Sequence, residues 1–141
     1  MKSSIIYYGI IPLGGSKMND YIINFLKEIM AIDSPSGYTK EVIHHCQKEA
    51  ENLGFHTHQT NKGNLEIYVE GQDDYTVGFC GHVDTLGLMV RSIKSDGTLA
   101  FTNVGGPIIP TLDGEYCRIH TRSGKCYTGT ILSNYPAVHV Y

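Results

Sequence analysis

The sequence predicts an α/β unit followed by an all-β module. Apolar residues recur at helical spacing only before residue 54, and beyond it short alternating runs are separated by glycine-containing turns. The 141 residues suffice for one ordinary domain, and 41% hydrophobic against 18% charged residues is typical of a globular chain. We therefore expect a layered α/β unit and, after it, a small barrel or sandwich of short strands.

Two amphipathic helices are predicted in the first part of the chain. Over residues 20–30 apolar side chains recur at spacings of three and four, with Asn19 or Asp20 as the candidate cap. The stretch SPSGY at 34–38 interrupts this pattern. A second helix follows over residues 39–52, with a glycine just beyond it as the stop signal.

Strands follow the second helix. The runs at 55–60, 64–70 and 75–84 are strand candidates, the first two joined by the turn NKGN. The third, YTVGFCGHVD, is apolar enough to be a central strand. After Gly87 two β-hairpins are predicted, one around the turn KSDG and one around the turn RSGK.

Charge and cysteine content exclude several classes of protein. The formal net charge is −3 and no Lys/Arg cluster occurs, so no nucleic-acid partner is expected. The four cysteines form no C-x-x-C pair, which favours a reduced, cytoplasmic protein. The apolar start is too short to span a bilayer, so no membrane partner is expected. Because Met18 opens the first helical pattern, residues 1–17 are interpreted as an extension that precedes the native start.

The motif H-x-D at His82 and Asp84 is the candidate site. Residues i and i+2 of an extended strand share one face, so the two side chains are expected to project together from the carboxyl end of the third strand. An imidazole suits zinc or cobalt, and a nearby carboxylate can hold its ring N–H. From these two residues alone, a polar turn at a strand end is the competing interpretation.

The stretch GHVDTLGLMV (81–90) resembles the A-H-x-D-E-x-G-x-M-V segment of the dinuclear metallo-aminopeptidase family, which includes glutamyl and tetrahedral (TET) aminopeptidases. Thr85 and Gly81 depart from that pattern, but neither position is a metal ligand in the family. Four other segments are similar to family segments in the same order. They are DSPSGYTKEV (33–42), GNLEIYVEG (63–71), SIKSDGTLAFTNVGG (92–106) and GTILSNYPAVHVY (129–141).

The resemblance implies that His82 is a metal ligand and that Asp84 supports the catalytic site. It implies a complete active site with two divalent metal ions, zinc or cobalt, acting on peptide substrates. It also implies a fold: residues 18–89 would begin an α/β phosphorylase/hydrolase-like catalytic domain, and residues 90–141 would begin an inserted PDZ-like β domain. That inserted domain builds dimers and larger shells in the family, so a homo-oligomer is expected.

The family's other ligands and its general-base glutamate come from later segments, so we expect the 141-residue chain alone to be inactive. Two alternatives stay open: a stand-alone interaction module formed by the β half, and a nonfunctional remnant. The other histidines are expected to be structural or solvated. They are His44, His45, His56, His58, His120 and His139.

Overall fold

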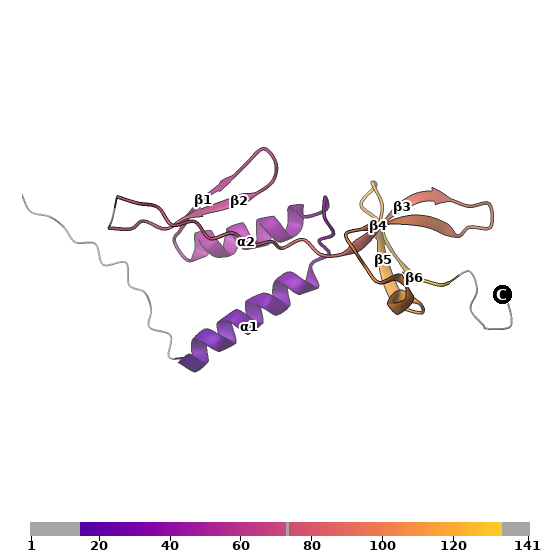
Figure 1. Cartoon of the computed structure of the whole chain (residues 1–141), viewed down its shortest axis with the longest axis horizontal. Coiled ribbons are helices and arrows are strands. Elements are labelled where there is room, and N and C mark those ends of the chain that lie inside the picture. The colour runs from indigo at the N-terminus through magenta and orange to yellow at the C-terminus, as the bar shows by residue number, and fades with distance from the viewer. Residues whose placement is uncertain (1–14, 73, 134–141) are drawn as a thin grey trace, which may run out of the picture. The chain divides into compact units, whose positions relative to one another are not determined.

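The structure is a computed structural model that describes residues 15–72 and 74–133. Contacts divide the chain into two compact units, one ending at Thr85 and one beginning at Leu86. The first holds two helices and a β-hairpin, and the second holds two β-hairpins and a short 3-10 helix (Figure 1). The predicted order of helices before strands is confirmed. The assignment of residues 18–89 and 90–141 to a catalytic and an inserted domain stays a prediction.

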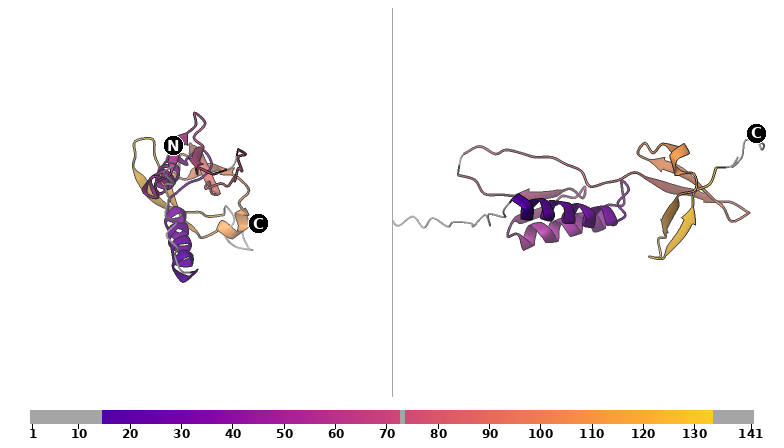
Figure 2. Two further views of the ribbon diagram at one scale, coloured as in Figure 1. Left: turned by 90° about the vertical axis from the view of Figure 1, so that its left-hand side faces the viewer. Right: turned by 90° about the horizontal axis from the view of Figure 1, so that it is seen from below.

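Unit 1 is built around its second helix. Helix α1 spans Gly15–Ala31 and α2 spans Lys40–Asn52, followed by the antiparallel strands β1 (His56–Gln59) and β2 (Leu65–Tyr68). Helix α2 contacts α1 on one side and the hairpin on another, whereas α1 does not reach the hairpin (Figures 1 and 2). Two helices followed by strands predict a layered α/β unit, and the described residues of unit 1 form such layers with a sheet of two strands.

Helix α1 begins five residues earlier than predicted. Asn19 and Asp20 were the candidate caps, but both lie inside the helix, which starts at Gly15. No proline occurs between Gly15 and Asp20, and lysine and methionine are good helix formers, so nothing in that stretch ends the helix. A side chain that can cap a helix does so only where the backbone leaves the helical conformation.

Polar and aromatic side chains join α1 to α2. The Tyr21 hydroxyl donates to Glu49 over 2.8 Å, and His45 Nε2 lies 3.1 Å from the Glu28 carboxylate. The His45 ring stacks on Phe25 with the centroids 5.7 Å apart. His45 is therefore a packing residue between the helices, not the solvated side chain that we expected; the neighbouring His44 is exposed.

The other side of α2 packs on the hairpin. Val42 is fully buried and Ala50 nearly so, and these are the buried apolar side chains among the described residues. The Thr57 hydroxyl donates to Glu51 over 2.9 Å, which ties β1 to the end of α2. The helix ends as predicted, with Gly54 at φ 86 just beyond its C-cap Leu53.

The prediction of a third strand in this unit, at residues 75–84, is wrong. These residues belong to no strand, and Phe79, in the middle of the predicted central strand, is 95% exposed. Alternating β-branched and aromatic residues show that a segment suits a pleated, half-buried setting. A strand also needs a neighbour that completes its ladder, and none pairs with this segment within the described residues.

Unit 2 consists of two hairpins. Strands β3 (Gly87–Ile93) and β4 (Leu99–Val104) form the first, and β5 (Tyr116–His120) and β6 (Cys126–Thr130) form the second. The 3-10 helix η1 (Ile109–Leu112) connects them. Both pairs are antiparallel as predicted, but they are separate two-stranded sheets, so the expected barrel or sandwich is not present among the described residues.

The three hairpins within residues 15–72 and 74–133 close with the same turn. In each, one backbone N–H bonds the carbonyl four residues on, and a glycine N–H bonds back to the first residue's carbonyl. That glycine has a positive φ in each case, the conformation of a three-residue loop with a glycine bulge. The three glycines are Gly63, Gly97 and Gly124. The turns NKGN, KSDG and RSGK thus behave as their sequences predict.

Within the described residues, neither helix combines the length and the apolar character that a membrane span requires.

We expect Val42→Ala to lower the free energy of unfolding of unit 1 by about 1–3 kcal/mol, because it removes two buried methyl-sized groups from a small core. Urea unfolding followed by far-UV circular dichroism measures this loss. Val69→Ala, at an exposed position, is the matched control. Equal losses in the two variants would contradict the assignment of Val42 to the core.

Burial, and then the hydrogen bond to Glu49, raise the pKa of Tyr21 to about 12. Because this exceeds the ordinary value near 10, the stabilisation that it contributes is complete below about pH 10 and is lost between about pH 10 and 12. Unfolding free energies measured across this range should fall less steeply in Tyr21→Phe than in the wild type. Tyr75→Phe, at an exposed site, should match the wild type; parallel curves for all three proteins would contradict the role of Tyr21.

We expect the isolated chain to self-associate on size-exclusion chromatography, because large apolar side chains of unit 2 are exposed. Four apolar residues near the end of the chain, Ile131, Leu132, Val138 and Val140, are the sequence's candidates for this patch. Leu132 is exposed and Ile131 half-buried, while Val138 and Val140 lie outside the described residues, as does His139. Leu132→Glu should shift elution toward the monomer. A sharp monomer peak for the wild type would count against this expectation.

Candidate functional site

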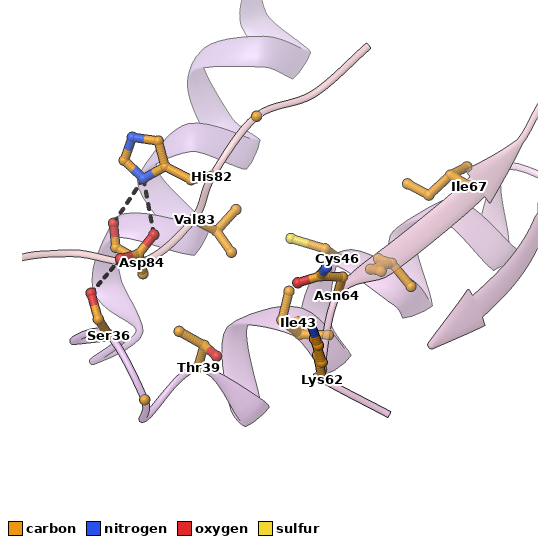
Figure 3. Close-up of a pocket in the computed structure, with 14 residues that line it drawn as sticks. Ser36, Thr39, Ile43, Cys46, Lys62, Asn64, Ile67, His82, Val83 and Asp84 are labelled. Atoms are coloured by element: carbon orange, nitrogen blue, oxygen red, sulfur yellow. Dashed lines mark hydrogen bonds and ion pairs between the residues drawn. The ribbon is translucent and has the colours of Figure 1, made fainter. Parts of the chain in front are cut away.

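His82 and Asp84 face each other at the end of unit 1 (Figure 3). His82 Nδ1 lies 3.1 Å from Asp84 Oδ1 and 3.1 Å from the Asp84 backbone oxygen. The expectation that residues i and i+2 bring these side chains together is therefore confirmed, although the segment is not a strand. Their roles in chemistry stay predictions.

The contacts define which ring nitrogen of His82 carries the proton. Both neighbours of Nδ1 are oxygens that only accept, a carbonyl and a carboxylate, so Nδ1 is the donor. In the neutral ring Nε2 then keeps its lone pair, which is the form that binds a metal ion. The His82 side chain is 82% exposed, so this nitrogen is accessible.

Ser36 is a third member of the group that the sequence did not indicate. Its hydroxyl donates to Asp84 Oδ2, the carboxylate oxygen that His82 does not use (Figure 3). This hydrogen bond, together with the neighbouring His82, lowers the pKa of the Asp84 carboxyl. Asp84 is thereby kept ionised, as an acceptor for both of its partners.

A second serine ties the backbone of the H-x-D segment to the loop between the helices. Ser34 is fully buried, and its hydroxyl donates to the Val83 carbonyl over 3.0 Å. The Ser34 carbonyl accepts the Thr85 N–H at 2.8 Å, and Pro35 forms an isolated parallel bridge with Thr85. The hydroxyl and the carbonyl of this buried residue are thus hydrogen-bonded, which offsets the cost of burying these two groups.

By its sequence alone, this loop is predicted only to interrupt a helix. Ser34 and Ser36 lie 49 and 48 residues before their partners, and no spacing rule links positions so far apart. The similarity of DSPSGYTKEV to a family segment was the one signal that the loop is more than a connection.

A hollow of about 470 Å³ opens beside this group (Figure 3). Burial raises the pKa of the Cys46 thiol on its wall, so this cysteine remains protonated at neutral pH and is a poor metal ligand. The hollow gives room next to His82 for a further group. Its lining residues are Ser36, Gly37, Thr39, Ile43, Cys46, Lys62, Gly63, Asn64, Leu65, Ile67, Gly81, His82, Val83 and Asp84.

Among the described residues, His82 has the chemistry of a metal ligand. His82 fits as one ligand, because its Nε2 is exposed and unprotonated in the neutral ring. No three histidine, cysteine, aspartate or glutamate side chains gather into a set that could hold an ion in the part of the chain that the structure describes. A protein zinc site takes about three such ligands, so His82 alone does not complete one.

Comparison with known proteins identifies relatives of this chain. The model of the M42 glutamyl aminopeptidase family matches residues 63–141, which include His82 and Asp84. Putative aminopeptidase YhfE of Bacillus subtilis (strain 168) is 42% identical over 120 residues, or 84% of this chain and 35% of that protein. The chain therefore spans about a third of the length of this relative.

Two solved structures resemble more than four fifths of this chain. The TET aminopeptidase from the marine sediment archaeon Thaumarchaeota archaeon SCGC AB-539-E09 matches 82% of this chain and 32% of its own, with a TM-score of 0.74 and 28% identity. The TET1 peptidase of Pyrococcus horikoshii can assemble into a tetrahedron or a large octahedral shell. It matches 83% of this chain and 34% of its own, with a TM-score of 0.69 and 27% identity. The mixed helix and strand architecture is thus that of TET aminopeptidases.

Proposed function

Because this chain belongs to the M42 glutamyl aminopeptidase family, we propose that it is the amino-terminal part of a metal-dependent aminopeptidase that removes N-terminal residues from peptides. One observation supports this function most directly. The segment that matches the family presents a histidine whose Nδ1 is held by Asp84 and whose Nε2 is accessible.

His82 would bind one of two divalent metal ions, zinc or cobalt, through Nε2. When bound, the two metal ions would supply a Lewis acid for the scissile carbonyl and a water molecule that is nucleophilic at neutral pH. Asp84 accepts the Nδ1–H of His82, which orients the ring and increases the basicity of Nε2. Because the Asp84 carboxylate is ionised, it also stabilises the partial positive charge that the ring gains when it binds a cation.

We propose that the isolated 141-residue chain is inactive. His82 supplies one ligand, and the resemblance assigns the remaining ligands and the general base to segments that this chain does not contain. The chain spans about a third of its relatives. Activity would therefore require the remainder of an M42 fold, with its carboxylates and second histidine beside His82.

The β half of the chain would begin a PDZ-like domain inserted in the catalytic domain, through which the protein forms homo-oligomers. Tyr116 and Leu132 of unit 2 are exposed apolar side chains that suit such an interface. The similarity to a peptidase that assembles into closed shells supports the same proposal. Because the family model covers this half as well, we do not propose an independent interaction module. We place the protein in the cytoplasm on the basis of its cysteines.

A chimera tests this function. This chain should replace the corresponding third of YhfE, its relative at 42% identity, and the product should be assayed on aminoacyl-anilides with zinc or cobalt. We expect metal-dependent turnover by the chimera and none by the 141-residue chain alone. His82→Ala should lower turnover by at least about 100-fold, and Asp84→Asn should raise the metal concentration needed for half-activity by about 10–100-fold.

His44→Ala is the matched control, because His44 is an exposed histidine of α2 outside the site. It should leave turnover unchanged. Equal activities of the parent, His82→Ala and His44→Ala chimeras would exclude His82 as a ligand. Metal-dependent turnover by the isolated chain would exclude the need for the remaining segments.

A further inference from the structure

We infer that Ser36 is a positioning residue for the metal site: acting through Asp84, it holds the His82 ring in the orientation and the tautomer that leave Nε2 free. The inference deepens the proposed function, because Nε2 matters only if a metal binds there. It rests on three features of the molecule: the division of the Asp84 oxygens between two partners, the turn that presents Ser36, and the weak support of the segment that carries His82.

The two oxygens of Asp84 have different partners. Oδ1 accepts from His82 Nδ1 and Oδ2 accepts from Ser36 Oγ. A carboxylate rotates easily about its last torsion, because that torsion joins an sp³ to an sp² carbon. With Oδ2 held by Ser36, rotation would break a hydrogen bond to a charged group, which is one of the stronger kinds. Ser36 therefore keeps Oδ1 directed at His82.

Ser36 stands on a rigid support. It is the second residue of a four-residue turn closed by the Tyr38 N–H and the Pro35 carbonyl at 2.7 Å. Gly37, the third residue, has φ 88, which a type II turn requires at that position and which other residues adopt only with strain. The turn follows α1 and directly precedes α2, so the Ser36 hydroxyl is presented by a fixed backbone.

The segment that carries His82 has little support of its own. Residues 75–84 form no strand ladder in the described part of the chain. The same loop holds the backbone on both sides of Asp84, through the bonds from Ser34 to Val83 and Thr85. These bonds fix where the backbone runs, but they do not fix the Asp84 side chain. Ser36 supplies that second constraint, so the two serines have separable roles.

This separation gives a specific expectation for Ser36→Ala. The backbone bonds of Ser34 remain, so unit 1 should keep its fold, while Asp84 loses the partner that prevents its rotation. His82 Nδ1 would then keep only the Asp84 backbone oxygen as a steady acceptor. Because one of its two acceptors is weakened, the neutral ring should exchange Nδ1–H for Nε2–H in part of the population, and the nitrogen that binds a metal becomes protonated there. Ser36→Thr retains a hydroxyl on the same turn and should restore the wild-type state.

The tautomer is measured on the 141-residue chain labelled with ¹⁵N at histidine, from two-bond ¹H–¹⁵N correlations at about pH 8.5, where an ordinary imidazole is neutral. We expect the wild type and Ser36→Thr to show a protonated Nδ1 at His82. Ser36→Ala should show a mixture of the two tautomers with unchanged far-UV circular dichroism. Ser95→Ala, at an exposed serine of unit 2, is the matched control and should resemble the wild type.

A second readout uses the chimera with YhfE. Ser36→Ala should raise the metal concentration for half-activity by about 10-fold, in the range of other partners that orient a ligand, with little change in turnover at saturating metal. An unchanged tautomer in folded Ser36→Ala would overturn the inference, whatever the activity. Loss of fold in Ser36→Ala would also overturn it, because Ser36 would then be structural. If the tautomer shifts in Ser36→Ala but the His82→Ala chimera remains active, Ser36 does position the His82 ring. The proposal that His82 binds a metal ion would then be contradicted.

Discussion

The candidate site depends on the contact between the loop joining α1 to α2 and the segment that carries the H-x-D motif. Ser34 is fully buried there and uses both its hydroxyl and its carbonyl to bind the backbone of that segment. A buried polar group that loses its partner costs about 1–3 kcal/mol, so each of these bonds strongly favours one relative placement of loop and segment. This placement determines where the His82 and Asp84 side chains lie.

Polar contacts make up a large part of the interactions that hold the elements of unit 1 together, because its apolar core is small. Among the described residues only Val42 and Ala50 are buried apolar side chains. The helices are joined through the hydrogen bond of Tyr21 to Glu49 and through the His45 ring, which packs on Phe25. Such contacts form only in one relative orientation of the two helices, and each adds about 1 kcal/mol to the free energy of unfolding. They therefore contribute more to selecting how α1 and α2 pair than to the stability of the pair.

Features set by neighbouring residues were predictable from the sequence, and features set by distant ones were not. The three hairpin turns follow from a glycine at one position of each, and the approach of His82 to Asp84 follows from their spacing of two. The start of α1 was missed because Asn19 can cap a helix without being required to. Ser36 was missed because its partner lies 48 residues away and only the folded chain brings the two together.

The absence of the predicted strand at residues 75–84 and the incomplete ligand set of the proposed metal site are explained by one physical requirement. Val77 and Phe79 have the pattern of a buried strand, yet they are exposed, because the described residues offer no strand beside them. His82, three residues after Phe79, donates from Nδ1 and leaves Nε2 free, but the part of the chain that the structure describes gathers no set of three possible metal ligands around it. A strand ladder and a metal site both require groups from elsewhere in a fold, and relatives of this chain are about three times as long. If the rest of an M42 fold supplied a neighbouring strand, it would cover Phe79 and also bring side chains to the end of that strand, beside His82. The missing ladder and the missing ligands are therefore one requirement, not two.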